Sequence, residues 1–415
     1  MKTFNELYQY MLQSVLDASQ ESSDFSQSAL GEYDPNQLDC LLHPKKHPPI
    51  IRTGNCSCAK DSQCECLKKC AFDALYLTDE GVNVNPELCV GCQACIDECD
   101  SKKLEATTDI IPTLKAVRQS KALTYAMIAP AFSGQFPEQV SAGGLRSAMQ
   151  EVGFDGMVEV ALFADILTLK EALEFDHKIQ QENDFLLTSC CCPMWISMIR
   201  KQFHELLPHV PGSVSPMIAC GRVIKALHPD ALTVFIGPCL AKKQEARQPD
   251  IADAVDYVLT FEEMKNIFEA LGIHPVEMPD QEKNHSSKAG IIYARKGGVS
   301  EAVQTTLKAI NPDKTILTRQ ADGVAACKKM MQEILDGKRD ANFYEGMGCV
   351  GGCVGGPRTI LAADEGSALV NDYAAHASYP NPAQNPYVIE LLNRIGLSSI
   401  DSLIKEPNMF DRTIN

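Results

Sequence analysis

The chain has 415 residues, enough for about two or three domains, and its 45% hydrophobic and 22% charged residues are typical of an ordinary globular protein. Its formal net charge of −16 argues against a nucleic-acid surface, which would need a basic patch to neutralise phosphates. No apolar run reaches the roughly 20 residues that cross a bilayer, and the N-terminus lacks the pattern of a secretory signal. The composition therefore predicts a cytoplasmic protein that binds neither nucleic acid nor a membrane.

Eighteen cysteines are unusual in such a protein, because a reducing compartment disfavours structural disulfides and favours metal or catalytic use. Nine of them lie between Cys56 and Cys99, three are adjacent at Cys190 to Cys192, and a pair, Cys349 and Cys353, lies in a glycine-rich segment. This grouping predicts several metal centres.

Residues 1–49 begin with apolar and charged residues at helical spacing and are predicted to form a helical extension. Residues 89–99 then read CVGCQACIDEC, with the spacing C-x2-C-x2-C-x3-C at Cys89, Cys92, Cys95 and Cys99. In two-cluster ferredoxins, three thiolates of such a loop hold one 4Fe-4S cube while the fourth ligates the other cube. A structural zinc site would usually have two separated pairs of ligands.

The partner block lies upstream and is irregular at its front. Cys66 and Cys70 form its end, and Cys56, Cys58 and Cys64 compete for the two remaining places on the first cube. We favour Cys58 and Cys64, with Cys56 as the alternative. By the crossing rule, Cys99 completes the first cube with Cys66, and Cys70 joins Cys89, Cys92 and Cys95 on the second. Residues 50–106 thus resemble a bacterial two-cluster ferredoxin domain, which carries single electrons.

From residue 122 onward, apolar β-rich runs alternate with amphipathic helical stretches. Strands are predicted at 123–130, 157–163, 184–189, 232–238, 255–260 and 290–295. Strands that alternate with helices predict an α/β fold with parallel sheets covered by helices, in which the chemistry gathers beyond the carboxyl ends of the strands. Cys190 to Cys192 and Cys239 follow two of these predicted strands.

Six glycines surround Cys349 and Cys353 in the segment EGMGCVGGCVGGP, and they would let the backbone approach a bulky inorganic group. Cysteines from three loops are therefore expected to converge on one metal centre.

These three segments resemble the signature motifs of the FeFe-hydrogenases: SCCCPMW the first, GPCLAKKQE the second and EGMGCVGGCVGGP the third. The first motif resembles the branch with three cysteines, TSCCCPMW, rather than the commonest form. The resemblance implies a hydrogenase domain at 107–415, made of two parallel-sheet α/β lobes with the active site between them, after a small α+β ferredoxin-like domain at 50–106.

The cofactor implied by the resemblance is the H-cluster, in which a 4Fe-4S cube shares one thiolate with a di-iron unit carrying CO, cyanide and a bridging azadithiolate. Two additional 4Fe-4S clusters would lie in the ferredoxin-like domain. Alignment on the Cys-Pro-x-Trp end makes Cys192, Cys239, Cys349 and Cys353 the cube ligands, with Cys353 as the shared thiolate.

Further roles follow from the same resemblance. Cys191 matches the first proton-relay group, and Glu171 and Glu174 match two relay carboxylates on one helix face. The position of a relay serine in many relatives holds Pro211, so that a water molecule or Ser213 would have to close the gap. Cys190 replaces the usual serine, and both packing and a place beside the relay are open for it.

Around the di-iron unit, Lys242 matches a lysine that donates to cyanide, Glu245 matches a nearby acid, Ala129 and Pro130 match pocket-lining positions, and Met347 matches a packing methionine. Gly237 replaces a common methionine and is expected to open space beside the unit.

The expected activity is the interconversion of H2 with protons and electrons, with a ferredoxin or another low-potential carrier as partner and maturation proteins that supply the di-iron unit. A hydrogen sensor of low turnover and a hydrogenase-like iron–sulfur assembly factor are the alternatives. Cys191, Lys242, Met347 and the pair Glu171 and Glu174 favour a hydrogenase over an assembly factor, because each is useful mainly beside a di-iron unit.

Overall fold

The computed structural model describes residues 2–16, 31–56, 64–137, 140–281, 283–405 and 407–414. The chain starts with helix α1 (Phe4–Leu16), whose first turn is closed by a capping box: the backbone amide of Glu6 donates to the Thr3 hydroxyl, and the amide of Thr3 donates to the Glu6 carboxylate. Buried Phe4, Leu7 and Met11 form one apolar stripe of this helix. The helix packs on α3 (Pro35–Leu42) and α6 (Ile110–Gln119).

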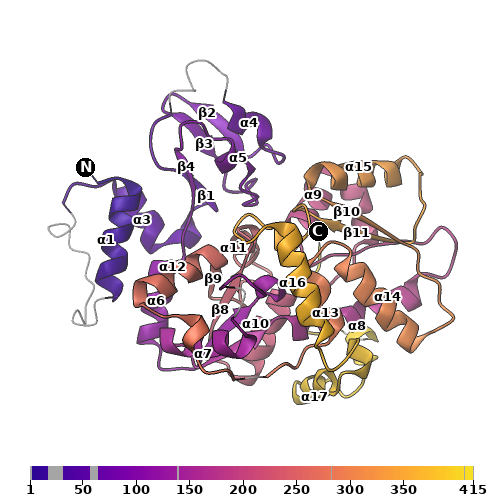
Figure 1. Ribbon diagram of the computed structural model, residues 1–415. Coiled ribbons are helices and arrows are strands. Elements are labelled where there is room, and N and C mark those ends of the chain that lie inside the picture. Colours follow the sequence, from indigo (N-terminus) through magenta and orange to yellow (C-terminus); the bar gives the residue numbers. More distant parts are fainter. Residues whose placement is uncertain are drawn as a thin grey trace.

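A small α+β unit follows at the top of Figure 1, and it packs on the large part of the molecule, where the Gln202 side-chain amide donates to the Ala71 carbonyl at 2.8 Å. Strand β1 (Ile50–Arg52) pairs antiparallel with β4 (Leu104–Ala106), so that the unit begins and ends in neighbouring strands. Strands β2 (Leu75–Thr78) and β3 (Gly81–Val84) form an antiparallel hairpin. The short helices α4 (Glu65–Lys69) and α5 (Ala94–Asp97) contact each other, and each carries part of a cysteine block.

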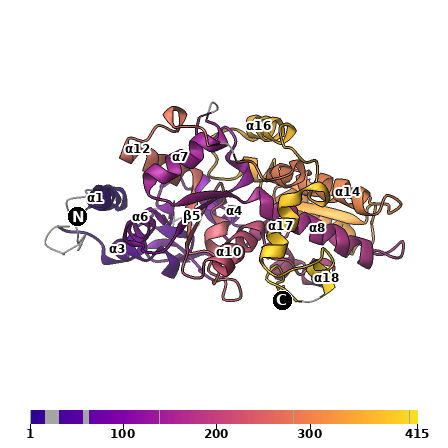
Figure 2. The same cartoon turned by 90° about the horizontal axis from the view of Figure 1, so that it is seen from below.

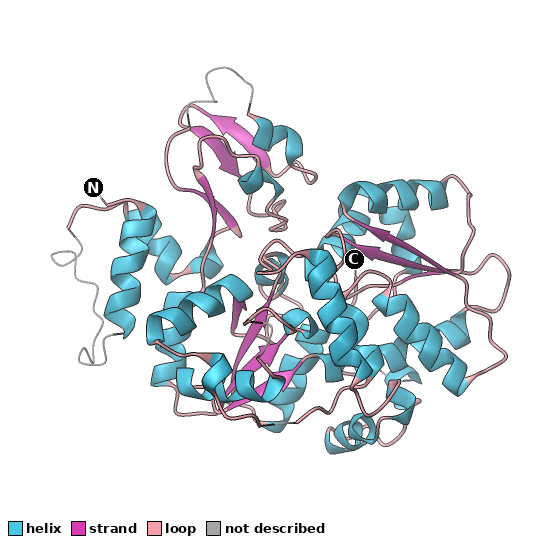
Figure 3. Ribbon diagram, viewed as in Figure 1, coloured by secondary structure: helices cyan, strands magenta, loops and turns pink. Residues whose placement is uncertain are grey.

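The remainder of the molecule is built on two separate parallel sheets, which Figure 3 shows in magenta among the covering helices. The first has the order β6-β5-β8-β9, with bounds Gly156–Glu159, Thr124–Ile128, Leu232–Gly237 and Tyr257–Thr260. The second has the order β10-β11-β7, with bounds Thr318–Asp322, Phe343–Met347 and Leu186–Leu187. The central strands β8 and β11 are buried almost throughout, as expected for parallel sheets covered on both faces.

Helices cover both sheets, and Figure 2 shows α8 and α14 side by side at the end of the molecule away from α1. Helix α8 (Ala161–Lys178) is buried along most of its length and contacts α10, α13, α14 and α17. The other helices of this part are α7 (Ala142–Val152), α9 (Pro193–Gln202), α10 (Pro216–Leu227), α11 (Ala241–Glu245), α12 (Phe261–Leu271), α13 (Lys288–Ile291), α14 (Gly298–Ile310), α15 (Val324–Leu335), α16 (Ala363–Ala375), α17 (Pro386–Arg394) and α18 (Ser402–Lys405).

The predicted strand at 290–295 is wrong: α13 and a 3-10 turn at Ile292–Ala294 occupy it. This apolar run is buried on all sides, and a fully buried helix and a fully buried strand have the same sequence signature. The strand predicted at 157–163 ends at Glu159, and α8 begins two residues later. In the described ranges, no helix is both long and apolar enough to span a membrane.

Candidate metal centre and proton path

Each of the three cysteine motifs follows the carboxyl end of a parallel strand. Cys192 caps α9 shortly after β7, Cys239 lies two residues after β8, and Cys349 lies two residues after β11. Because β7 and β11 run parallel in one sheet, their motifs meet at the same edge. The two sheets thus present their cysteine loops to a common space.

The glycines of the third motif are required by close packing between the motifs. A Cβ atom at Gly346 would come within 2.2 Å of the Trp195 ring of the first motif. A Cβ atom at Gly356 would lie 2.9 Å from the carbonyl oxygen of Pro238 in the second. The backbone amide of Gly348 also donates to the Cys192 sulfur at 3.3 Å. The motifs interlock, and this brings their four cysteines together.

Cys192, Cys239, Cys349 and Cys353 form one group of thiols. Burial, and then the neighbouring Cys192 and Cys239 sulfurs, raise the pKa of Cys353 to about 12. Burial, and then Cys192, raise the pKa of Cys239 to about 11. Partly buried cysteines whose neighbouring sulfurs raise the pKa of Cys239 and Cys353 fit a shared cationic cluster, since bound metal reverses this effect and deprotonates a coordinating thiol.

The small α+β unit holds two further groups. Burial, and then Cys64, Cys99 and Cys56, raise the pKa of Cys66 to about 11. Burial, and then Cys92, Cys89, Cys70 and Cys66, raise the pKa of Cys95. One group is therefore Cys56, Cys64, Cys66 and Cys99, and the other is Cys70, Cys89, Cys92 and Cys95.

Cys56 is buried, and its sulfur accepts from the Val82 amide at 3.2 Å, while Cys58 lies outside the described residues. The Cys70 sulfur accepts from the Ala74 amide at 3.2 Å. Amide donors of this kind tune iron–sulfur clusters.

Among the described residues, no three His, Cys, Asp or Glu side chains converge on a single metal ion. In a cube, by comparison, the four thiolates bind four different iron atoms.

The three groups lie in series. Cys66 of the first interacts electrostatically with Cys95 of the second. Cys92 of the second interacts with Cys349 of the third, and both pack on the apolar cluster around Trp195. The order in space matches an electron path from the small unit to the interlocked motifs.

A mainly apolar cavity adjoins the third group. Of the predicted residues, Ala129, Pro130, Cys191, Cys239, Lys242 and Cys353 line it. Glu245 and Met347 are buried but are not among its lining residues. Phe235 and Tyr293 also line it, and the sequence analysis did not identify them. Tyr293 lies in a 3-10 turn within the segment predicted as a strand, and a strand there gave no reason to expect Tyr293 in the cavity.

Lys242 is a buried cation at the wall of this cavity. Its ammonium group donates to the Glu245 carboxylate at 2.6 Å. Burial opposes its charge, but Glu245 and then the Cys239 and Cys191 sulfurs hold the pKa of Lys242 above its ordinary value. The cavity therefore has a fixed cationic donor in a mainly apolar wall that also contains the Cys191 thiol and Tyr293.

The space expected beside Gly237 does not exist. A Cβ atom at this position would lie 2.7 Å from the Phe235 ring and 3.0 Å from the Ala129 Cβ atom. Because Phe235 itself lines the cavity, its ring fills the volume that the glycine was expected to open.

Glu171 and Glu174 lie buried on α8, outside the cavity lining. Burial, with the carboxylates of Glu174 and Glu345, raises the pKa of Glu171 to about 8, although Thr188 and Lys170 act against the shift. Burial also disfavours ionised Glu174, yet Lys170 and Lys178 outweigh it and hold the pKa of Glu174 below its ordinary value. Glu171 therefore favours its protonated form near neutral pH, whereas Glu174 favours its ionised form and is the weaker base of the two.

Cys190 and Ser213 lie next to this pair. The Cys190 thiol donates to the Val214 carbonyl at 3.5 Å and interacts electrostatically with Glu171. The Ser213 hydroxyl accepts from the Lys170 ammonium group at 3.1 Å. Cys191, which lines the cavity, interacts electrostatically with Cys190. Thiols and carboxyls thus extend from the cavity to α8.

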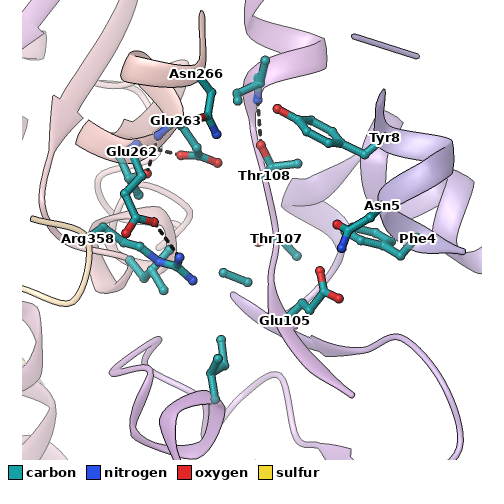
Figure 4. A pocket seen from close by; sticks show the side chains of 15 residues that line it. Phe4, Asn5, Tyr8, Glu105, Thr107, Thr108, Glu262, Glu263, Asn266 and Arg358 are labelled. Carbon is teal, nitrogen blue, oxygen red and sulfur yellow. Dashed lines mark hydrogen bonds and ion pairs between the residues drawn. The ribbon is translucent and has the colours of Figure 1, made fainter. Parts of the chain in front are cut away.

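A second cavity lies where α1, the segment after β4 and α12 meet (Figure 4). Its α1 side is formed by Phe4, Asn5 and Tyr8, and on the opposite side Arg358 pairs with Glu262 at 2.7 Å. Predicted ligand and relay residues do not line it. It lies at the junction between the N-terminal helix and the large part of the molecule.

The sequence model described as "Iron only hydrogenase large subunit, C-terminal domain" matches residues 122–357, more than half of the chain. The chain belongs to this family, and the matched region contains all three interlocked motifs.

The NADP-reducing hydrogenase subunit HndD of Solidesulfovibrio fructosivorans is 24% identical over 78% of this chain and 66% of its own length. Iron hydrogenase 1 of Clostridium pasteurianum is 27% identical over 52% of this chain and 45% of its own length. The chain therefore spans less than two thirds of both relatives. Probable cytosolic Fe-S cluster assembly factors of Drosophila species are also similar, for example one of D. melanogaster at 22% identity over 45% of this chain.

Among solved structures, the apo FeFe-hydrogenase HydA1 of Chlamydomonas reinhardtii superposes with a TM-score of 0.60 at 21% identity, covering 74% of this chain and 98% of that one. The likeness establishes the fold, an α/β hydrogenase H-cluster domain, as the sequence predicted.

Proposed function

We propose that this chain is an FeFe-hydrogenase that interconverts H2 with protons and electrons. The observation that carries the proposal is the series of three four-cysteine groups, of which the last adjoins an apolar cavity with a thiol and a buried lysine. Family membership supports the same conclusion.

In the proposal, Cys192, Cys239, Cys349 and Cys353 hold the H-cluster, and the cavity beside Cys353 receives its di-iron unit. The donor set supports this, because four cysteine sulfurs that lie close together are a suitable ligand set for an iron–sulfur cube. When bound, the H-cluster supplies the iron site at which H2 is made or split, with the help of its bridging azadithiolate. Lys242, which lines the cavity and donates to Glu245, would also donate a hydrogen bond to the di-iron unit, and Ala129, Pro130 and Phe235 in the lining would exclude water. Met347 packs behind the site.

Cys191 is the proposed first protein group of the proton path. It lines the cavity, and a neutral thiol exchanges a proton without carrying a charge through an apolar wall. Glu171 and Glu174 form the next steps, and their opposite pKa shifts support Glu171 as the carboxyl that holds a proton and Glu174 as the ionised, weaker base. Glu245 fixes the position of Lys242.

Electrons would enter through two 4Fe-4S clusters in residues 50–106. We propose Cys56, Cys64, Cys66 and Cys99 for the first and Cys70, Cys89, Cys92 and Cys95 for the second, with residues 107–415 as the hydrogenase domain. The buried position of Cys56 beside Cys66 supports this choice, while Cys58, the preferred residue in the sequence, lies outside the described residues. A ferredoxin or another low-potential carrier would be the partner in the cytoplasm, and maturation proteins would supply the di-iron unit.

An iron–sulfur assembly factor is the second candidate, because such proteins occur among the relatives. It would need the cubes but no di-iron unit, and the apolar cavity with Lys242 and Cys191 would then have no use. The cavity therefore favours the hydrogenase.

Infrared spectroscopy after anaerobic maturation separates the two. A hydrogenase is expected to show CO and cyanide stretching bands, and a Cys353→Ala control is expected to lose them. Iron–sulfur absorbance without these bands in the wild-type protein would support the assembly factor instead. H2 turnover with a low-potential dye then distinguishes the enzyme from a hydrogen sensor, which would keep the bands but turn over slowly.

A further inference from the structure

Lys170 is a buried lysine on α8, next to Glu171, that no sequence motif identified. Its ammonium group contacts the Glu174 carboxylate, the Ser213 hydroxyl at 3.1 Å and the Asp411 carboxylate at 3.1 Å. Only 3% of its side chain is exposed. A buried ammonium group is costly unless it is paired, so these three contacts define a specific place for a positive charge.

Asp411 reaches Lys170 from the C-terminal segment of the chain. This segment lies alongside 212–214: the Val214 amide donates to the Phe410 carbonyl at 2.9 Å, and the Arg412 amide donates to the Gly212 carbonyl at 2.9 Å. The amide of Asn408 donates to the other Asp411 carboxylate oxygen at 2.8 Å. The Asp411 side chain is therefore fixed from both sides, although it is 33% exposed.

The two carboxyls of the proton path differ in what faces them. Glu174 lies between the ammonium groups of Lys170 and Lys178, the second at 3.0 Å and half exposed. Glu171 lies near one further carboxyl, that of Glu345, and has one buried oxygen without a hydrogen-bond partner among the described residues. The titratable groups around the pair are Cys190, Tyr293 and Glu345 on the Glu171 side, and Lys170, Lys178 and Asp411 on the Glu174 side.

We propose that Lys170 is a positioning residue of the proton path: its ammonium group, shared between Glu174 and Asp411, keeps Glu174 ionised, makes it the weaker base of the two carboxyls, and so gives the Glu171 and Glu174 pair an inward direction. The inference rests on the proposed hydrogenase function for its role in turnover. In the inward step, the O–H bond of Glu174 breaks and one forms on Glu171. The negative charge moves to Glu174, where Lys170 stabilises it, and a proton from the Lys178 side restores Glu174.

This arrangement makes signed predictions for two substitutions. Lys170→Met removes the cation and is expected to raise the pKa of Glu174 by about 1 to 3 units. Asp411→Asn removes the anion that competes for Lys170 and is expected to move the pKa of Glu174 in the opposite direction. Lys178→Met is the matched control: its ammonium group also contacts Glu174 but is half exposed, so that solvent screening makes its effect smaller.

The measurement is a pH titration of the protonated-carboxyl infrared band in the full-length protein with its iron–sulfur cubes, assigned by its loss in Glu174→Gln. It requires no turnover. Opposite shifts in Lys170→Met and Asp411→Asn support the inference. An unchanged pKa of Glu174 in all variants would overturn it. If Lys170→Met does not fold, the shift of the Glu174 pKa in Asp411→Asn decides alone.

The role in turnover has its own readout. In active enzyme, Lys170→Met is expected to move the pH profile of kcat in the same direction as the Glu174 titration, with unchanged CO and cyanide bands. A shifted titration with an unchanged pH profile would overturn the relay role. If the wild-type protein lacks the bands and turnover, the proposed function fails, and the titration still decides whether Lys170 controls Glu174.

Discussion

Cys191 and Cys190 are adjacent thiols with different surroundings. Cys191 lines the apolar cavity, whereas Cys190 donates to the Val214 carbonyl behind it. Within the proposed hydrogenase, only Cys191 is in a position to exchange a proton with a group in the cavity. The triplet of cysteines therefore contains three different environments, since Cys192 belongs to the four-thiol group.

Cys191→Ala is expected to slow H2 turnover by about 10²- to 10⁴-fold, because one proton-transfer group is removed. The CO and cyanide infrared bands should persist, since Cys191 is not a proposed ligand. Cys190→Ser is the control, because a hydroxyl can keep the hydrogen bond to Val214. A dye-linked turnover assay measures both variants, and unchanged turnover in Cys191→Ala would contradict its role.

The raised pKa of Glu171 predicts that wild type and Glu171→Gln differ in how their free energy of unfolding depends on pH. Its pKa is raised from 4.5 to about 8 in the folded chain, so the folded state binds more protons than the unfolded state between these values. The free energy of unfolding therefore falls through this group as the pH rises from 4.5 to 8. Glu171→Gln removes this dependence, and its stability relative to wild type should increase over the same range and level off above it. Thermal unfolding at several pH values tests this, and a parallel pH dependence in both proteins would contradict it.

At the scale of elements, helix α11 joins the second cysteine motif to its surroundings through Lys243. The Lys243 ammonium group is fully buried and donates to the Thr107 carbonyl at 3.0 Å and to the Glu263 carboxylate at 2.8 Å. Asp109 lies 3.6 Å away. These contacts connect α11 to α12 and to the segment that leads from β4 into α6, and two of the residues contacted, Thr107 and Glu263, line the cavity in Figure 4.

Lys243→Met is expected to destabilise the protein by about 3 to 5 kcal/mol, because it leaves the buried Glu263 and Asp109 carboxylates without their cation. Lys265→Met is the control: it removes an exposed ion pair to Glu269, which contributes at most about 1 kcal/mol. Chemical denaturation of both variants gives the comparison. Similar losses in the two would show that the buried network adds little.

At the scale of the whole molecule, the three cysteine groups form one path from the small unit to the cavity. The proposed ligand set of the first group contains Cys56 and not Cys58, and mutation can test this choice. Cys56→Ala is expected to remove one 4Fe-4S cube, lowering iron content by about four atoms per chain, whereas Cys58→Ala should keep it. Iron analysis together with the electron paramagnetic resonance of the reduced protein tests this. Loss of the cube in Cys58→Ala but not in Cys56→Ala would instead support Cys58 and Cys64 as ligands of the first cube, as the sequence favoured.

Much of this path could be predicted from the sequence, because cysteine spacing within a loop determines which thiols can meet. The loops after β7 and β8 were also predicted, since their strands are continuous apolar runs. Strands β10 and β11 were missed because TRQAD and FYEGM have neither alternation nor an apolar run. Their pairing depends on tertiary contacts.

The side chains that no motif contains could not be predicted. Lys170 acquires its importance from Ser213 and Asp411, which are distant along the chain. Phe235 enters the cavity only because Gly237 leaves its ring room, and Tyr293 belongs to a buried run whose helical form the sequence does not reveal. Such contacts arise from the packing of separate elements.

The close approach of Gly346 to Trp195 has a genetic consequence. Because a Cβ atom at 346 would occupy the space of the indole ring, the two positions cannot vary independently. A population carrying Gly346→Ala should regain function through second-site changes that shorten residue 195 or move α9, rather than through changes elsewhere in the third motif. The interlocked motifs would thus evolve as one unit, although more than 150 residues separate them along the chain.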